Sequence, residues 1–313
     1  MNLKDLRYVI AVAEYRHFGH AAEACHVTQP TLSGQIKKLE EELGVILFER
    51  TKRSVVVTPM GDEILRHARL AVEHADQIVS LARARREPMT GPLHLGVIPT
   101  LSPYLMPLIL RPLRQRYPNL RLVLSEEVTD RLLSRLHDHE IDVALIATTV
   151  AEPDLCELPL FEEPFWLAHP RQHALYDKDE IEPSDLAGLD LLLLTDAHCL
   201  SGQVRDVCAA AGHSDPTGMG DLRTASLETL LQLVGAGFGC TLVPALAIRG
   251  SWTTDAGVIA RPIAGSSASR RVAMVYRRSY PRVDTLERLA RLIREQLPNT
   301  VKRLASVSIG RTG

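Results

Sequence analysis

The sequence predicts a multidomain chain of the α+β class, built from a small helical unit with a hairpin, a long linker helix and a two-lobed α/β unit. Three observations predict this order. Apolar residues recur at helical spacing from Leu3 to Leu43, a heptad pattern runs from Pro59 to Arg86, and strands alternate with helices after Leu93. With 313 residues, of which 45% are hydrophobic, the chain is long enough for two or three domains with buried cores.

Residues 1–61 are predicted to form a winged helix-turn-helix. A first helix ending at Phe18-Gly19 and a short second helix from Ala21 precede a third helix that opens at Thr28-Gln29-Pro30. Proline suits the first turn of a helix because no intrahelical hydrogen bond is lost there. The apolar, β-prone stretch Ser54–Thr58 predicts the wing. A plain three-helix bundle would show similar apolar stripes, but the close-packing alanines, the tight turn and the hairpin together favour the winged form.

The third helix presents two different faces. Its apolar residues, spaced four, three and four apart, are expected in the core: Leu32, Ile36, Leu39 and Leu43. The other face carries short polar and basic side chains at a helix N-terminus, which suits a helix that enters the major groove of DNA. The residues expected at DNA are Thr28, Gln29, Pro30, Thr31, Ser33 and Lys37 on this helix and Arg53 in the wing. Residues 1–61 hold eight Lys or Arg against seven Asp or Glu, so this expectation rests on pattern and not on charge.

This pattern resembles the N-terminal domain of LysR-type transcriptional regulators. The resemblance is carried by short motifs spread over the whole unit: Ala21-Ala22, Leu32-Ser33, Leu39-Glu40, Leu43-Gly44, Leu47-Phe48-Glu49-Arg50 and Thr58-Pro59-x-Gly61. It implies a DNA-binding transcription regulator and not an enzyme. The implied partners are double-stranded promoter DNA, RNA polymerase and further copies of the chain, in a homodimer or a homotetramer.

Residues 62–87 are predicted to form the linker helix. Apolar residues recur at alternating steps of four and three, as in a heptad seam: Ile64, Ala68, Ala71, Ala75, Ile78 and Ala82. One interpretation is a helix docked on its own domain. The other is a seam between two chains, which is favoured because recognition of two DNA half-sites needs a dimer. The stretch 87–92 contains two prolines and a glycine, so it is expected to break the helix and act as a hinge.

Residues 88–300 are predicted to form an α/β regulatory (effector) domain with two lobes. The first lobe, about 93–164 plus 268–297, holds the strands Leu93–Ile98, Leu120–Val128, Ile141–Ala147 and Val272–Arg277 and the helices Pro103–Tyr117, Asp130–Glu140 and Thr285–Leu297. The second lobe, 165–267, holds the strands Leu191–Leu194 and Thr241–Val243 and the helices Gln203–Ala211 and Leu227–Ala236. This layout resembles the periplasmic-binding-protein-like effector domain of the LysR family, in which a ligand lies between the lobes. Residues 301–313 are basic and lack periodicity, so a mobile tail is expected there.

Two cysteines carry the chemistry that the sequence suggests. Cys199 is expected at or just before a helix N-terminus, beside His198. The partial positive charge of the helix end and a protonated imidazole would both favour the thiolate, the form that attacks peroxide. Cys208 lies on the apolar face of the same helix. If helical, the nine-residue step between the two cysteines spans about 13 Å, beyond the roughly 7 Å that a disulfide allows between Cα atoms. The alternative is that both are unreactive buried cysteines.

A second set of motifs resembles the peroxide-sensing members of the LysR family. The motifs are Ile98-Pro99-Thr100, Thr129, His198-Cys199, Gln203, Cys208 and Ala225-Ser226-Leu227-Glu228-Thr229-Leu230, within a likeness that covers Leu3 to about Leu297. The resemblance implies that hydrogen peroxide oxidises Cys199, that Cys208 resolves the product as a disulfide, and that this bond switches conformation and DNA contacts.

The same resemblance implies the remaining site residues. Thr100 and Thr129, at predicted strand ends, would hold peroxide through their hydroxyls, with His198 and Gln203 beside them. Thr129 could instead be only a helix N-cap. Arg271 is assigned to the thiolate or the leaving hydroxide, and Arg270 is an equally placed candidate.

The chain departs from the family at three positions beside the reactive cysteine. Ala197, Ser201 and Gly202 stand where the family has Gly, Arg and Asp, which puts peroxide sensitivity in question. Two other functions remain open at this point: a regulator that binds a small metabolite between the lobes, and a thiol peroxidase with an unusual N-terminal domain.

The composition limits which cellular compartment and which cofactors are expected. The sequence shows no signal-peptide pattern and no apolar run near the roughly 18 residues of a membrane helix, so a cytoplasmic protein without membrane contact is expected. Its cysteines number five, an odd count that argues against a structural disulfide framework. The cysteines other than the reactive pair are expected to be unreactive: Cys25, Cys156 and Cys240. No histidine shows ligand spacing with cysteine, so neither a metal nor another cofactor is expected.

Overall fold

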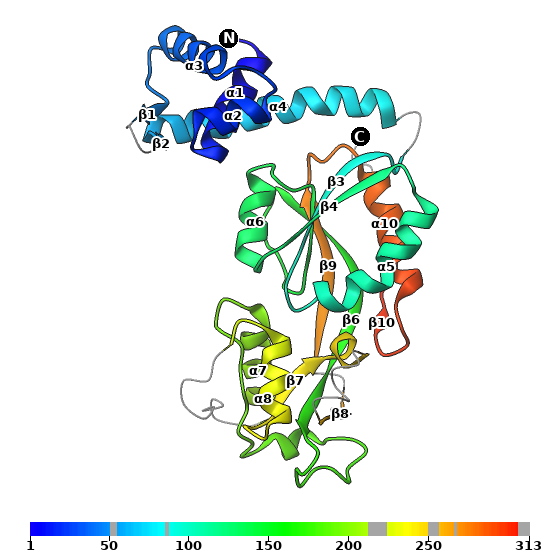
Figure 1. Ribbon diagram of the computed structural model, residues 1–313. Coiled ribbons are helices and arrows are strands. Elements are labelled where there is room, and N and C mark those ends of the chain that lie inside the picture. The colour runs from blue at the N-terminus through cyan, green and yellow to red at the C-terminus, as the bar shows by residue number, and fades with distance from the viewer. Residues whose placement is uncertain (51–54, 85–87, 212–223, 250–256, 266–267, 306–313) are drawn as a thin grey trace. The chain divides into compact units, whose positions relative to one another are not determined.

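The computed structural model describes residues 1–50, 55–84, 88–211, 224–249, 257–265 and 268–305 (Figure 1). The chain divides into two compact units, Met1–Pro88 (unit 1) and Met89–Gly313 (unit 2). Among the described helices, none has the length and apolar character needed to cross a membrane. The wing residue Arg53, which is predicted to contact DNA, lies outside the described residues.

Unit 1 confirms the predicted winged helix-turn-helix. Its elements are α1 (Leu3–Tyr15), α2 (Phe18–Ala24), α3 (Gln29–Leu43), the antiparallel hairpin β1 (Phe48–Arg50) and β2 (Val55–Val57), and α4 (Pro59–Ala84). Pro30 occupies the first turn of α3, as its missing N–H requires. The hairpin is tied to α3 because Glu40 Oε1 accepts hydrogen bonds from the backbone N–H groups of Leu47 (2.9 Å) and Phe48 (3.2 Å).

Two local predictions in unit 1 differ from the structure. Phe18 and Gly19 begin α2 instead of ending α1, because Arg16 takes a left-handed conformation (φ 48°) and the His17 side chain then caps α2 by accepting from the Gly19 N–H. Leu43 is 36% exposed, since it is the last residue of α3, beyond the part that packs on the core.

The linker helix α4 is buried against the rest of unit 1 near its start and carries exposed apolar side chains farther along. Near its start, Leu65 and Ala68 are 3% exposed, and Leu65 joins the core of unit 1. Farther along, Ile78 is 70% exposed and Val79 is 49% exposed. The first part of the predicted seam is therefore docked on its own domain, and apolar side chains of the second part are available to another chain.

The first lobe of unit 2 is built on parallel strands (Figure 1). Strand β3 (Gly91–Val97) lies between β4 (Leu120–Glu126) and β5 (Val143–Ile146), and β5 pairs antiparallel with β9 (Ser269–Arg277). The helices of this lobe are α5 (Ser102–Arg116), α6 (Thr129–His137) and α10 (Val283–Gln296). Gly96 permits close packing of α6 on β3, since a Cβ there would lie 2.5 Å from Leu132 Cδ2.

The second lobe is reached through two long strands. The 16-residue strand β6 (Leu155–Pro170) pairs with β9 from Leu155 to Pro164 and then with β7 (Thr241–Pro244) and β8 (Val258–Pro262). This double crossing confirms the predicted two-lobed topology. The other elements of this lobe are the 3-10 turns η1 (Pro183–Leu186) and η2 (Ala245–Arg249) and the helices α7 (Cys199–Ala210) and α8 (Leu227–Gly235).

Two predicted segments of unit 2 take other forms. Leu191–Leu194 is buried as predicted, but it forms isolated parallel bridges, Leu191 with Cys240 and Leu194 with Thr224, instead of a continuous strand. Lys302–Arg303, within the stretch predicted to be a mobile tail, form β10, which pairs antiparallel with Glu162 and Phe161 of β6. The preceding Val301 is 7% exposed, and burying this side chain favours order there. Residues 306–313 lie outside the described ranges.

Candidate redox site and DNA interface

The N-terminal end of α3 carries most of the predicted DNA-binding residues on its exposed face. Exposed side chains are those of Thr28, Gln29, Pro30, Thr31 and Lys37, whereas Ser33 is partly buried. The hydroxyls of Thr28 and Thr31 are 2.8 Å apart and hydrogen-bonded to each other. Lys37 faces solvent beside Glu41 at 3.8 Å, a weak exposed pair that leaves the ammonium able to contact phosphate.

The two candidate redox cysteines lie at opposite ends of one helix. Cys199 is the first residue of α7 and is partly buried, and Cys208, 1% exposed, lies nine residues later in the same helix. Both are free thiols. Burial raises the pKa of the Cys208 thiol. Because a helix rises about 1.5 Å per residue, the intact α7 holds the two Cα atoms roughly 13 Å apart, too far for a disulfide.

Burial disfavours the protonated form of His198, the form that would add positive charge beside Cys199. His198 immediately precedes α7 and is 7% exposed. Burial lowers its pKa, and a hydrogen bond to the backbone of Ala225 opposes this only in part. The N-terminus of α7 is a source of positive potential at Cys199 that does not depend on the charge of the neighbouring ring.

Three strand ends of the first lobe gather the other candidate residues. Thr100, Thr129 and Ala147 follow β3, β4 and β5, and the carboxyl ends of parallel strands meet at one edge of a sheet. Gln203 of α7 reaches this edge, where its Nε2 donates to the Ala147 carbonyl at 2.6 Å. The contact brings the helix of Cys199 from the second lobe to the strand ends of the first.

Two oxygens among these residues are buried and have no hydrogen-bond partner within the described part of the chain: Thr129 Oγ1 and Gln203 Oε1. Thr129 is not an N-cap, since Val128 holds that position before α6. Buried polar atoms are nearly always hydrogen-bonded. Unpartnered oxygens from both lobes therefore suit a small hydroxylic ligand.

Arg270, and not Arg271, faces the candidate site. Its Nη1 donates to Thr100 Oγ1 at 2.9 Å, its Nη2 donates to the Thr100 carbonyl at 3.0 Å, and its Nε donates to Glu163 Oε2 at 2.9 Å. Arg271 is 61% exposed and lies 3.8 Å from Glu162. The assignment to Arg271 is corrected because successive side chains of β9 point to opposite faces of the sheet.

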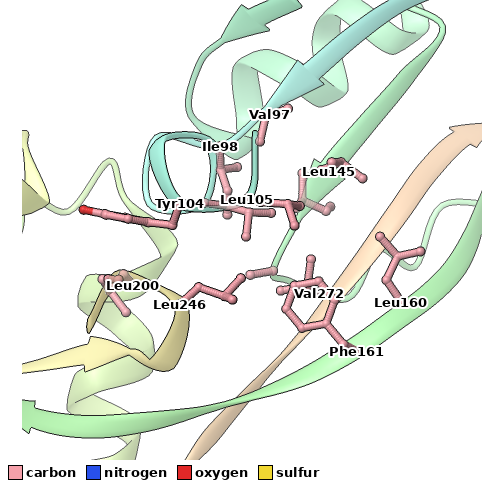
Figure 2. Close-up of a cluster of buried hydrophobic side chains, with 14 of the residues drawn as sticks. Val97, Ile98, Tyr104, Leu105, Leu145, Leu160, Phe161, Leu200, Leu246 and Val272 are labelled. Carbon is pink, nitrogen blue, oxygen red and sulfur yellow. The ribbon is translucent and has the colours of Figure 1, made fainter. Parts of the chain in front are cut away.

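Apolar side chains from both lobes, including that of Leu200, pack at the lobe junction (Figure 2). Leu200, which directly follows Cys199, is 2% exposed, and Leu246 of the second lobe lies in the same cluster as Ile98 and Leu105 of the first. Ser201, one of the three departures from the family, is also 2% exposed. The burial of Leu200 therefore fixes the position of the adjacent Cys199.

One contact at this junction, between Tyr104 and Glu228, has no signal in the sequence. Tyr104 of α5 donates a 2.9 Å hydrogen bond to Glu228 of α8, across 124 positions of sequence. A pairing at that separation leaves no local pattern, unlike the helix start at Cys199.

Comparisons with known proteins agree with this architecture. The model of the bacterial regulatory helix-turn-helix protein of the lysR family matches residues 3–62, and that of the LysR substrate binding domain matches residues 86–298. The hydrogen peroxide-inducible genes activator of Pectobacterium carotovorum subsp. carotovorum is 42% identical over 305 residues, which are 97% of this chain and 100% of that protein.

Two solved structures extend the comparison to the whole chain. A full-length OxyR from Pseudomonas aeruginosa with a cysteine-to-aspartate substitution has a TM-score of 0.83 and 36% identity, covering 98% of this chain and 99% of that one. A hydrogen-peroxide-bound OxyR from Corynebacterium glutamicum with a cysteine-to-serine substitution has a TM-score of 0.66 and 37% identity, covering 94% and 92%. The chain belongs to the LysR family of transcription regulators and, within that family, to the OxyR group.

Proposed function

We propose that the protein is a DNA-binding transcription regulator that senses hydrogen peroxide through Cys199. The observation that carries the proposal is the position of this thiol. It begins a helix whose Gln203 reaches the strand ends of the first lobe, and both Gln203 Oε1 and Thr129 Oγ1, at one of those strand ends, are unpartnered within the described residues. A helix N-terminus favours the thiolate, which is the nucleophile toward peroxide. A relative of 42% identity, named a hydrogen peroxide-inducible genes activator, supports the same function.

The first chemical step oxidises Cys199. The thiolate sulfur attacks one peroxide oxygen, the O–O bond breaks, and hydroxide leaves as the sulfur becomes a sulfenic acid. We assign Thr100, Thr129 and Gln203 to holding the peroxide, and Arg270 to fixing Thr100 and stabilising the leaving hydroxide. His198, whose pKa burial lowers, is assigned to hydrogen bonding and not to supplying charge.

In the second step Cys208 attacks the sulfenic sulfur. A Cys199–Cys208 disulfide forms, and the sulfenic oxygen leaves as water after taking up the thiol proton. Because the intact α7 keeps these residues about 13 Å apart, the bond requires the helix to unwind. Unwinding is the event that we propose changes the DNA contacts.

Unit 1 is assigned to reading promoter DNA. We assign Gln29, Thr31 and Ser33 to base edges, Arg53 to phosphate, and Thr28, Pro30 and Lys37 to the same DNA-binding surface. Two such units are needed for two half-sites, so we propose a homo-oligomer, dimer or tetramer, joined in part through the exposed apolar side chains of Ile78 and Val79 on α4, with RNA polymerase as a further partner.

Cys199→Ser tests the redox assignment. The variant should bind promoter DNA like the native protein but form no disulfide after one equivalent of hydrogen peroxide, as mapped by differential alkylation and mass spectrometry. Cys156→Ser is the matched control, because Cys156 is also partly buried but lies on β6. A peroxide response that survives in Cys199→Ser would refute the assignment and favour a regulator that binds a small metabolite between its lobes.

A further inference from the structure

A line of hydrogen bonds crosses between the lobes at a place that the peroxide chemistry above does not use. Tyr104 lies in the first turn of α5, and its hydroxyl donates to Glu228 Oε1 at 2.9 Å. The other carboxylate oxygen, Glu228 Oε2, accepts from Ser226 Oγ at 2.9 Å. Ser226 also caps α8 by accepting from the Thr229 N–H at 3.4 Å. Both oxygens of one carboxylate are therefore bonded, one of them to the opposite lobe.

Tyr104 is held firmly in this position. Its ring lies beside the apolar cluster at the lobe junction and its hydroxyl points away from those side chains (Figure 2), and the residue as a whole is 9% exposed. Burial and the carboxylate of Glu228 raise the pKa of the phenol far above its usual value, so it remains a donor throughout the physiological range. A hydrogen bond from a buried donor to a charged acceptor is of the strong kind.

On the second-lobe side, the same segment is bound to the start of the reactive helix. The ring of His198, next to Cys199, hydrogen-bonds the backbone of Ala225, which directly precedes Ser226. The backbone of Thr195, just before the cysteine loop, donates to the carbonyl of Thr224 at 3.0 Å. Residues 224–228 are thus tied to the cysteine loop at one end and to Tyr104 at the other.

On the first-lobe side, Tyr104 belongs to the turn that follows Thr100. The backbone N–H of Tyr104 donates to the Leu101 carbonyl at 3.2 Å. Thr100 itself accepts two hydrogen bonds from Arg270. A displacement of Tyr104 therefore moves the start of α5 and, with it, the threonine assigned to peroxide.

We propose that Tyr104 and Glu228 are positioning residues for the oxidation of Cys199 by peroxide. Their hydrogen bond keeps Thr100, at the edge of the first lobe, in the position relative to Cys199 of the second lobe that the reaction needs. The inference rests on the proposed function of Cys199. It adds a distinct claim: the reaction with peroxide depends on a lobe-to-lobe contact that touches neither reactant. Effective reaction geometry is lost by displacements near 1 Å, so one bond at the lobe junction is enough to matter.

The test compares two reactions of the same thiol in the full-length reduced protein. Tyr104→Phe keeps the ring and removes the hydroxyl. It should slow oxidation of Cys199 by hydrogen peroxide by about tenfold, the effect of losing one hydrogen bond to a charged group, while alkylation by iodoacetamide, which needs no lobe register, changes by less than about twofold. Tyr280→Phe is the matched control, because Tyr280 is 5% exposed and its hydroxyl has no hydrogen-bond partner among the described residues.

A second pair of variants keeps the proposal testable if Tyr104→Phe does not fold. Glu228→Gln retains an oxygen that accepts the phenol hydrogen bond and should oxidise near the native rate, whereas Glu228→Ala should be slow. Equal effects on peroxide and iodoacetamide rates, or a Tyr280→Phe variant as slow as Tyr104→Phe, would overturn the positioning role. Failure of the native protein to oxidise at Cys199 would instead overturn the proposed function.

Discussion

Arg270 and Glu163 form a buried ion pair with no exposed side-chain surface on either partner. Their remaining polar atoms are bonded as well, since Thr100 accepts from the guanidinium and the Leu246 N–H donates to Glu163 Oε1 at 2.7 Å. Breaking such a pair leaves an isolated charge in the interior, which costs far more than the pair itself contributes.

Arg270→Ala should therefore lower the free energy of unfolding by about 3–5 kcal/mol. Arg271→Ala, its neighbour on the opposite face, should change the free energy of unfolding by less than about 0.5 kcal/mol because its pair with Glu162 is exposed. Urea unfolding followed by tryptophan fluorescence measures both in unit 2, since both tryptophans of the sequence, Trp166 and Trp252, belong to it. Equal losses in the two variants would contradict the assignment of the buried face.

At the scale of residues, the sequence predicted that Cys199 lies at or just before a helix N-terminus, although it put the helix itself at Gln203–Ala211 and α7 begins at Cys199. It did not predict which residues meet across the fold. Cys199 was found from a local pattern, a loop followed by a helix. The choice of Arg270 over Arg271 needed the register of β9, and the predicted strand began at Val272, three residues after the observed start at Ser269. The lowered pKa of His198 was not predictable because the burial that causes it comes from residues distant in sequence.

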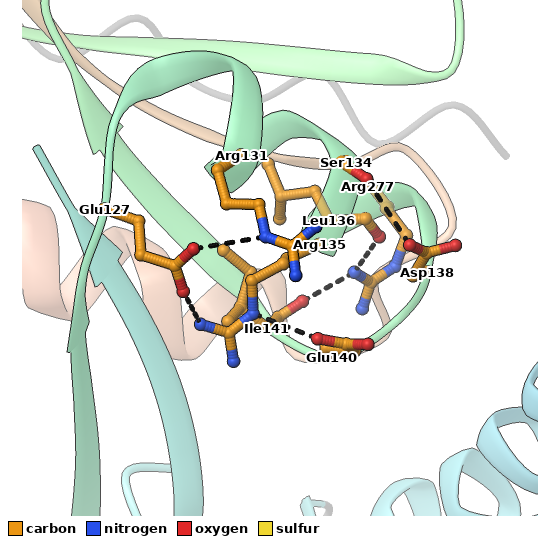
Figure 3. Close-up of polar contacts among 9 residues, drawn as sticks. All are labelled: Glu127, Arg131, Ser134, Arg135, Leu136, Asp138, Glu140, Ile141 and Arg277. Atoms are coloured by element: carbon orange, nitrogen blue, oxygen red, sulfur yellow. Dashed lines mark hydrogen bonds and ion pairs between the residues drawn. The ribbon is translucent and has the colours of Figure 1, made fainter. Parts of the chain in front are cut away.

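At the scale of elements, the corner after α6 depends on a second buried arginine (Figure 3). Arg277 of β9 donates at 2.6 Å to the carbonyls of Leu136 and Ile141, on either side of the corner. His139, between them, takes a left-handed conformation with φ 59°. Burial and the charge of Arg277 lower the pKa of His139 to about 4.

This corner predicts a dependence of stability on pH. Between the unfolded pKa near 6.5 and the folded value of about 4, the unfolded state binds more protons at His139, so the free energy of unfolding falls as pH decreases. His139→Asn should make that slope shallower, because asparagine tolerates the left-handed conformation and does not titrate. Urea unfolding of unit 2 at a series of pH values from 7.5 to about 4 measures the slope.

His67→Asn is the control for this measurement, because His67 is an exposed residue of α4 in unit 1. It should leave the pH slope of unit 2 unchanged. A slope in His139→Asn identical to that of the native protein would show that other groups control acid unfolding.

At the scale of the whole molecule, the order of units and the crossing between lobes were predictable, because hydrophobic periodicity and strand–helix alternation are local signals summed over many residues. The contacts that join the lobes were not predictable from the sequence. Tyr104 with Glu228 and Gln203 with Ala147 bring together positions more than 50 residues apart. The pairing of Lys302–Arg303 with β6 was missed for the same reason, since edge-strand pairing depends on a partner that the local sequence does not contain.

The contacts between the lobes predict how far from α7 a Cys199–Cys208 disulfide changes the structure. Bringing Cys199 and Cys208 within about 7 Å unwinds the helix, removes Leu200 and Val204 from their buried positions and breaks the bond from Gln203 to Ala147. Hydrogen exchange in the oxidised protein should therefore increase in residues 199–210 and also at the end of β5 and the start of α8. Cys208→Ser treated with peroxide stops at the sulfenic acid, keeps the helix and should show no such spread. A Cys199–Cys208 disulfide with exchange changes confined to α7 would refute the switch, because α7 would then unwind without disturbing the lobe that it contacts.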